Sequence, residues 1–196
     1  METVEIIAQI AGVFGMIFIS TSFQYKTQRN LILSQMVGAT FFFLNFLLLG
    51  IAAGTVLIGA IMNLIGILRA VVFSNKDKFH ADKPIWLIGF IAAYFVSYVL
   101  VFTLFGTSVN AKNIIVEALP VIGMTSSTIA FLSKEAKQTR RLGFITSPSW
   151  LIYDAINLSI GGVITEVLSL ASITLGIIRH DLKGKNTVES NSVSKQ

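Results

Sequence analysis

Two acidic residues, Asp154 and Glu166, stand in a stretch of sequence that is otherwise apolar enough for a lipid bilayer. A carboxylate inside a membrane-length apolar segment is costly, so it normally faces the interior of a helix bundle or a water-filled cavity. Two interpretations are open. The acids either hold neighbouring helices together, or they line a polar pocket or pathway between helices.

Aromatic and amide side chains accompany the first of these acids. Trp150 lies four residues before Asp154 and Asn157 lies three residues after it, so a helix would place all three on one face. An aromatic platform beside an amide and a carboxylate suits a small polar or cationic solute. Packing of Trp150 against neighbouring helices is the alternative. A further hypothesis makes Asp154 a proton-coupling site.

Two asparagines in other apolar segments extend the candidate pocket. Asn45 aligns close to Asp154 when the two halves of the chain are compared, and Asn63 should point inward because an amide facing lipid is costly. Glu166 falls in the first turn of its predicted helix, where it would complement the helix N-terminus. The candidate substrate-binding residues are Asn45, Asn63, Trp150, Tyr153, Asp154, Asn157 and Glu166.

Two arginines, Arg69 and Arg179, end predicted helices. Their long side chains predict anchoring at the cytoplasmic headgroups. Binding of an anionic substrate group, or a role in a cytoplasmic gate, is the alternative.

Enzymatic chemistry finds little support in the sequence. The chain has no cysteine, and His80 and His180 have no companion ligands nearby, so no metal site or other cofactor is expected. No pairing of a nucleophile with a base is recognisable. The net charge of +5 comes from short loops between apolar segments, which indicates membrane orientation rather than binding to nucleic acid.

Composition indicates an all-α polytopic membrane protein. Of the 196 residues, 54% are hydrophobic and 13% are charged, about half the charged fraction of a soluble domain. A spanning helix needs about 20 mostly apolar residues. Seven segments fit, at residues 6–23, 31–49, 55–73, 85–105, 114–132, 142–160 and 163–178. The polar tail 183–196 is expected to be disordered.

Basic residues alternate with the predicted segments in a regular way. They follow the first, third, fifth and seventh segments, whereas the other loops carry a single basic residue, Lys112. The positive-inside rule then predicts an N-terminus outside and a C-terminus in the cytoplasm.

An internal repeat relates residues 6–73 to residues 114–182. Gly15-Met16 matches Gly123-Met124 at a separation of 108, and the GILR that ends at Arg69 matches the GIIR that ends at Arg179 at a separation of 110. Each unit holds three segments, and the segment 85–105 lies between them. The sequence therefore predicts a 3+1+3 arrangement of seven transmembrane helices, with two parallel units related by an axis along the membrane normal.

The chain resembles the bacterial inner-membrane YgjV family over about residues 6–183. The resemblance rests on SFQYKTQR, NLIGILRAVVF, SPSWLIYDAINLSIGGVITE and GIIRHDLK. More distantly, the arrangement is similar to the SWEET and PQ-loop transporter superfamily. The resemblance to the YgjV family implies a multi-pass protein of the inner membrane. The Pro-Gln dipeptide of PQ-loop proteins is replaced here by Phe23-Gln24. The Asn that the sugar transporters of this superfamily place in their seventh helix is not reproduced.

The predicted function is transport of a small polar solute, by alternating access between the two units. The alternative is a non-transporting scaffold, receptor or regulator. The lipid bilayer is the expected environment, and assembly into a homo-oligomer is left open.

Overall fold

Helices account for the regular structure of the described chain. The structure is a computed structural model that describes residues 3–53, 58–104, 108–156 and 160–182. The helices are α1 (Thr3–Ser22), α2 (Gln28–Ala53), α3 (Ile58–Ser74), α4 (Lys76–Phe79), α5 (Pro84–Thr103), α6 (Ala111–Leu132), α7 (Ala136–Ile156), α8 (Ile160–Gly176) and a π-helical turn, η1 (Ile177–Leu182). The described residues form no strand beyond one isolated bridge between Thr27 and Glu135.

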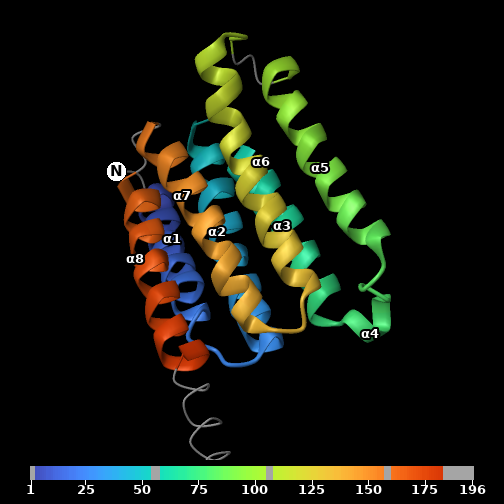
Figure 1. The fold of residues 1–196 in the computed structure, drawn as a ribbon. Coiled ribbons are helices and arrows are strands. Elements are labelled where there is room, and N and C mark those ends of the chain that lie inside the picture. The colour runs from blue at the N-terminus through green and yellow to red at the C-terminus, as the bar shows by residue number, and fades with distance from the viewer. Residues whose placement is uncertain (1–2, 54–57, 105–107, 157–159, 183–196) are drawn as a thin grey trace, which may run out of the picture.

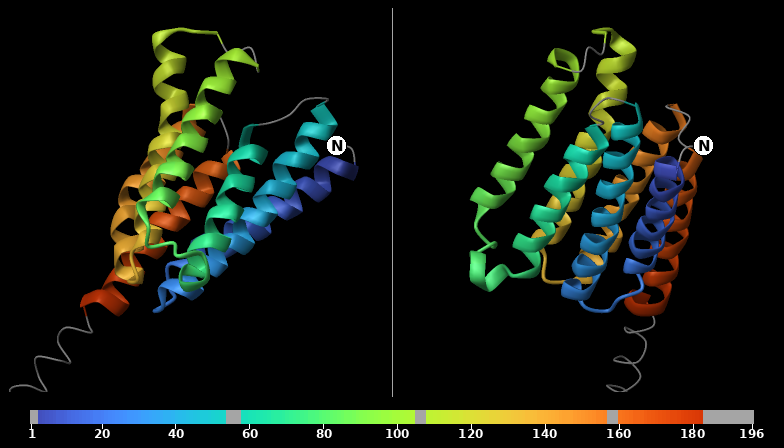
Figure 2. Two further views of the ribbon diagram at one scale, coloured as in Figure 1. Left: turned by 90° about the vertical axis from the view of Figure 1, so that its right-hand side faces the viewer. Right: turned by 180° about the vertical axis from the view of Figure 1, so that it is seen from behind.

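Six of the long helices form two groups of three, which face each other (Figure 1). Within each group the helices pack in chain order, α1 on α2 on α3 and α6 on α7 on α8. The groups meet where α1 packs on α8, α2 on α7 and α3 on α6. Helix α5 packs against α3 and α6 at the edge of the bundle. The groups approach each other at one end and diverge toward the other (Figure 2, left).

Within the described ranges, five helical segments are long and apolar enough to cross a membrane. They are α1, residues 28–52 of α2, α5, α6, and residues 161–182 across α8 and η1. Two of the seven predicted spans do not meet these criteria. The apolar part of α3, Gly59–Ser74, is short. Helix α7 begins six residues before its predicted start and includes Lys137, Arg140 and Arg141, which lower its hydropathy.

Local sequence explains several helix boundaries. Pro84 occupies the first turn of α5, where its missing N–H is not needed. The Asn110 side chain accepts a hydrogen bond from the Asn113 backbone N–H at 2.9 Å and caps the start of α6. The short α4 was not predicted. It ends at His80, whose positive φ of 48° is the left-handed conformation typical of a helix end.

The outer surface is apolar, which suits contact with lipid. Phe95 on α5 is 60% exposed, and large aliphatic side chains such as Ile10 and Val167 are about half exposed on α1 and α8. Helix α6 is the most buried of the membrane-length helices, since half of its apolar stretch is buried. The bundle therefore turns apolar side chains outward, and α6 is buried among α3, α5 and α7.

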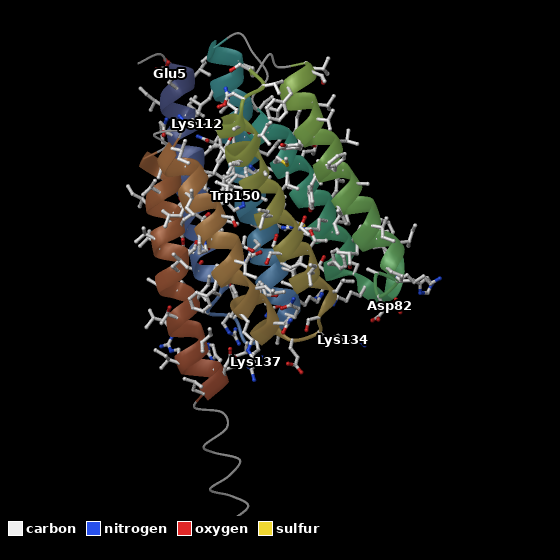
Figure 3. The ribbon with its side chains drawn as sticks, turned by 45° about the horizontal axis from the view of Figure 1, so that its top comes forward. Glu5, Asp82, Lys112, Lys134, Lys137 and Trp150 are labelled. Carbon is white, nitrogen blue, oxygen red and sulfur yellow. The ribbon has the colours of Figure 1, made fainter. Side chains whose placement is uncertain are left out.

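Basic residues are concentrated at one end of the bundle. Lys134 and Lys137 lie at one end, and Glu5 and Lys112 lie at the other, with Trp150 between them (Figure 3). Residues of the α1–α2 loop, the α6–α7 loop and η1 line a common cleft at the first end. We call this the basic end.

Candidate functional site

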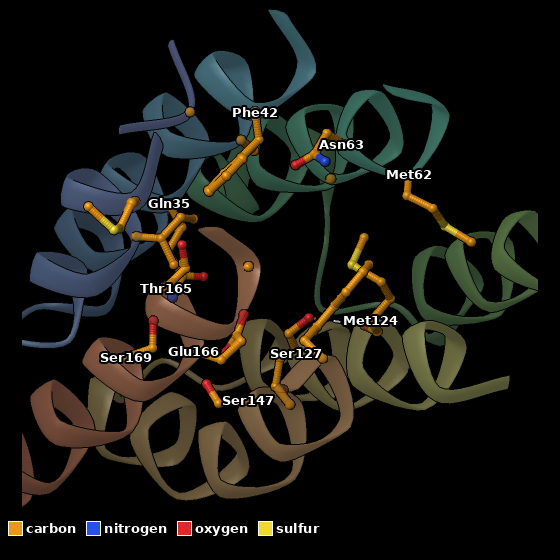
Figure 4. A pocket seen from close by; sticks show the side chains of 18 of the residues that line it. Gln35, Phe42, Met62, Asn63, Met124, Ser127, Ser147, Thr165, Glu166 and Ser169 are labelled. Atoms are coloured by element: carbon orange, nitrogen blue, oxygen red, sulfur yellow. Dashed lines mark hydrogen bonds between the residues drawn. The ribbon is translucent and has the colours of Figure 1, made fainter. Parts of the chain in front are cut away.

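A cavity of about 560 Å³ separates the two groups of helices. Its walls come from α1, α2 and α3 on one side and from α6, α7 and α8 on the other, and α5 contributes none of the described lining residues. The cavity extends from Phe23 near the basic end to Gln9 and Leu49 near the opposite end. Its polar and apolar wall residues are drawn in Figure 4.

Seven pairs of lining residues from the first two helices of each group recur at one separation. This separation is 108 positions, the value that Gly15 and Gly123 suggest in the sequence. The pairs are Met16 with Met124, Ile19 with Ser127, Phe23 with Phe131, Gln35 with Gly143, Ala39 with Ser147, Phe42 with Trp150 and Phe46 with Asp154.

The third helices follow a different separation. Met62 and Thr165, Asn63 and Glu166, and Gly66 and Ser169 each stand 103 positions apart. The predicted match of Arg69 with Arg179 at 110 therefore does not describe the cavity wall. The separations of 110 and 103 differ by seven residues, about two helical turns. Both therefore match residues on the same face of the third helices, but at different depths.

Helix packing repeats along with the lining residues. A Cβ atom placed on Gly15 would stand 2.8 Å from the Phe42 ring, and one on Gly123 would stand 2.9 Å from the Trp150 indole nitrogen. Both pairs are related by 108 positions. In each group a glycine thus makes room for an aromatic side chain on the cavity wall.

The structure brings five of the predicted site residues to this cavity, namely Asn45, Asn63, Trp150, Asp154 and Glu166. The two amides also bond within their own group of helices. Asn45 donates to the Ala8 carbonyl at 2.7 Å, and Asn63 donates to the Gly59 carbonyl at 2.8 Å. Each amide therefore has part of its hydrogen-bonding capacity occupied by backbone.

The acidic side chains lie near the end opposite the basic loops. Asp154 packs tightly over Gly162 at the α7–α8 contact. Glu166 hydrogen-bonds with Ser147 on α7. The prediction that Glu166 occupies the first helical turn was wrong, because α8 begins at Ile160 and places it beyond that turn.

Of the two remaining predicted site residues, Tyr153 is described and does not line the cavity. The Tyr153 ring meets the Trp150 ring edge-on at 5.9 Å. Its hydroxyl hydrogen-bonds with Glu117 on α6. Asn157 lies outside the described residues, as does the predicted tail 183–196.

Arg69 differs from its prediction. It is 7% exposed and lines the cavity, so the predicted anchoring at headgroups was wrong. Its guanidinium donates to Ser127 Oγ at 2.6 Å and lies 4.6 Å from the centre of the Phe131 ring. These acceptors on α6 draw the side chain inward. Arg179, in contrast, is exposed in η1, and its anchoring stays a prediction.

Hydrogen bonds between the two groups of helices close the cavity at the basic end. Gln28 donates to Thr139 Oγ1 at 2.7 Å, and Gln24 donates to the Ser172 carbonyl at 2.7 Å. Arg140 donates across to the Tyr25 carbonyl at 3.0 Å, and its pairing with Asp181, within its own group, orients the guanidinium. We call these six side chains the basic-end clasp: Gln24, Gln28, Thr139, Arg140, Ser172 and Asp181.

A lysine outside the membrane helices adds a further link at this end. Lys76 of α4 donates to the Leu132 carbonyl at 2.6 Å and to the Ser133 carbonyl at 2.5 Å. Burial, and then the positive charge of Lys134, lowers the pKa of Lys76 to about 8. The described residues hold no group of three or more metal-ligating side chains.

Several wall residues were missed by the sequence analysis. Phe42, Ser147 and Ser169 carry no unusual signal for a membrane helix, and Arg69 was read as an anchor. The internal repeat contains part of the missing signal, since a shift of 108 positions from Trp150 leads to Phe42.

The comparisons with known proteins agree with a membrane location. No curated protein and no solved structure matches the chain. One family model, described as bacterial inner membrane protein, matches residues 6–183. With an apolar exterior, several membrane-length helices and this match along most of its length, the chain belongs to the Imp-YgjV family of bacterial inner membrane proteins.

Proposed function

We propose that this protein carries a small polar solute across the bacterial inner membrane. The observation that supports the proposal best is the central cavity, whose wall repeats at 108 positions in two helix pairs and at 103 in the third. Two similar units around one central site are the architecture in which alternating access arises by rocking one unit against the other.

In this proposal all seven long helices cross the membrane in a 3+1+3 arrangement, with α5 as the linking helix. The bridge between Thr27 and Glu135 supports a two-fold relation between the units, because these residues are 108 positions apart and pair antiparallel. A residue that pairs antiparallel with its own repeat equivalent lies beside a two-fold axis. The cavity and the clasp lie between the same two units.

The proposed orientation places the basic end in the cytoplasm and the N-terminus outside. The loops that carry Lys26 and Lys134 share that end with Arg179 of η1, as the positive-inside rule requires of cytoplasmic segments. The clasp then closes the cytoplasmic side. Among the described residues, the hydrogen bonds between the two groups lie at or toward this side. In this proposal the conformation described is therefore closed toward the cytoplasm.

A non-transporting scaffold or receptor is the competing proposal. The bonds of Asn45 and Asn63 to backbone carbonyls favour it, because those amides already serve helix packing. The equivalent position of Asn63 and Glu166 favours transport, since both units then offer a polar side chain at the same depth of the cavity.

Ligand-induced thermal stabilisation of the purified protein distinguishes the two proposals. Sugars, amines, amino acids and nucleosides are screened, because a solute that binds the folded state raises its apparent stability. Transport predicts a hit that Trp150→Phe weakens and Trp86→Phe does not, followed by exchange of that solute in liposomes. Trp86 is the matched control, because its indole donates to the Phe79 carbonyl outside the cavity. A screen without any hit favours the scaffold.

A further inference from the structure

Arg69 is a buried cation in the wall of the central cavity. Its side chain is 7% exposed, and it comes from the basic-end half of α3. Arginine stays protonated in proteins, so the positive charge persists inside the bundle. Taking such a charge out of water is costly unless it is paired and fully hydrogen-bonded.

The bonds of Arg69 use one nitrogen of its guanidinium. Nη1 donates to Ser127 Oγ at 2.6 Å, to the Met124 carbonyl at 3.1 Å, to Thr128 Oγ1 at 3.2 Å and to the Tyr94 hydroxyl at 3.4 Å. These acceptors are all neutral. They fix the position of the group but do not neutralise its charge.

The opposite edge of the guanidinium keeps its donors. Nε is buried without a hydrogen-bond partner, and Nη2 makes none of the hydrogen bonds found among the described residues. Nε and Nη2 together form the fork that binds the two oxygens of a carboxylate. The ion pair found within the described ranges joins Arg140 to Asp181, so Arg69 has no counter-ion there.

The acidic groups of the cavity lie farther from the basic end. Asn63 and Arg69 are six residues apart on α3, about 9 Å along the helix axis. Glu166 lines the wall at the level equivalent to Asn63, and Asp154 also lines it. Arg69 is the one basic residue among the described lining residues, so a second negative charge on a solute would lack a partner there, which favours a monoanion over a dianion.

We infer that Arg69 is the docking point for the carboxylate of a monoanionic solute, bound through Nε and Nη2. This inference rests on the proposed transport function and assigns its substrate class. Ser127 and Thr128 hold the guanidinium in place, and the Phe131 ring supports its face at 4.6 Å. The apolar wall contributed by Met62 and Phe42 accommodates the rest of the solute.

The test compares short monocarboxylates from acetate to hexanoate with their uncharged amides, as stabilisers of the purified wild-type chain. Sodium chloride at equal concentration is the reference, and methyl phosphate and succinate are the dianion arms. The expected result is a concentration-dependent rise in Tm with a monocarboxylate, and none with its amide. Arg69→Gln should weaken the apparent affinity by about tenfold or more, whereas Arg179→Gln, an exposed arginine outside the cavity, should not change it.

Arg69→Lys keeps the charge without the fork and should bind the carboxylate more weakly than wild type does. It replaces Arg69→Gln if that variant does not fold. Equal stabilisation by carboxylate and amide, an unchanged affinity in the Arg69 variants, or preference for the dianions would overturn the inference. Hits confined to neutral solutes would overturn it while leaving transport intact. A screen without any hit would contradict both.

Discussion

The internal repeat is clearest in contacts between single residues. Gly15 faces Phe42 and Gly123 faces Trp150 across equivalent helix contacts. The match of Gly15 with Gly123 predicts the 108-residue separation from the sequence. The sequence does not predict which aromatic side chain each glycine faces, because that depends on how the helices cross.

Gly123→Ala is predicted to destabilise the fold and displace Trp150. The added Cβ would stand 2.9 Å from the indole nitrogen and 3.4 Å from the Thr146 carbonyl. Overpacking of this kind costs about 1–3 kcal/mol. The measurement is unfolding in detergent, together with the fluorescence of Trp150 in a Trp86→Phe background.

Gly89→Ala is the matched control. Nothing lies within 4 Å of a Cβ at this position on α5, and alanine is the better helix former. This variant should be as stable as wild type or slightly more stable. Equal behaviour of the two variants would contradict the packing assigned to Gly123.

Arg69 and Glu166 mark the limit of sequence reasoning about single residues. Arg69 was expected at the membrane surface, but hydroxyl and carbonyl groups on α6 draw it inward. Glu166 was expected to cap a helix, but α8 begins too early for that. Both errors arise because a side chain's partners lie on another helix, which no local pattern reveals.

At the scale of the elements, the hydrophobic segments predicted six of the seven long helices to within a few residues at most ends. The exception, α7, begins earlier because Arg140 and Arg141 continue the helix past the apolar segment. Its charge also explains why α7 does not count among the membrane-length apolar helices. The Arg140 guanidinium pairs with Asp181 and donates to loop carbonyls, so the burial of this charge depends on tertiary contacts.

Loss of the Arg140–Asp181 pair should destabilise the protein. The two side chains are 3% and 7% exposed, and removing one partner of a buried pair leaves the other charge uncompensated. Asp181→Asn is expected to cost roughly 3 kcal/mol. Asp82→Asn changes an exposed aspartate and should stay within about 0.5 kcal/mol of wild type. Unfolding in detergent at neutral pH compares the two, and equal stabilities would refute the role given to the pair.

The link between α4 and α6 should appear in the pH dependence of stability. Because the pKa of Lys76 is lowered from 10.5 to about 8, the folded state binds fewer protons than the unfolded state between these values. Stability therefore rises with pH across that window, and below about pH 8 the cost of the buried charge is constant.

Lys76→Gln should remove this rise, whereas Lys83→Gln, at an exposed position, should keep it. The measurement is the unfolding midpoint of the three proteins from pH 7 to pH 10.5 in one detergent. Parallel profiles for Lys76→Gln and wild type would exclude a perturbed Lys76.

At the scale of the whole molecule, the sequence predicted two similar units with a polar site between them, and the cavity lies between the two groups of helices. The depth of the third helices was not predictable. Their sequence match at 110 positions aligns Arg69 with Arg179, although the cavity wall repeats at 103. Helix α2 has 26 residues and α7 has 21, so α2 is five residues longer, which matches the change from 108 to 103. A short apolar motif does not reveal such a difference.

Access to the cavity from the two sides of the membrane is the most direct test of alternating access. The chain has no cysteine, so Ala39→Cys introduces a single thiol into the cavity wall. A membrane-impermeant maleimide is applied to intact cells and to inside-out vesicles. Val109→Cys and Lys134→Cys, both exposed and at opposite ends, calibrate the two sides.

We predict that Ala39→Cys reacts from outside and not from the cytoplasm. Adding Asp181→Asn should open the clasp and permit reaction from the cytoplasm as well. If the calibrating thiols react as expected while Ala39→Cys stays unreactive from both sides in both backgrounds, the cavity is a sealed interior and the transport proposal is contradicted.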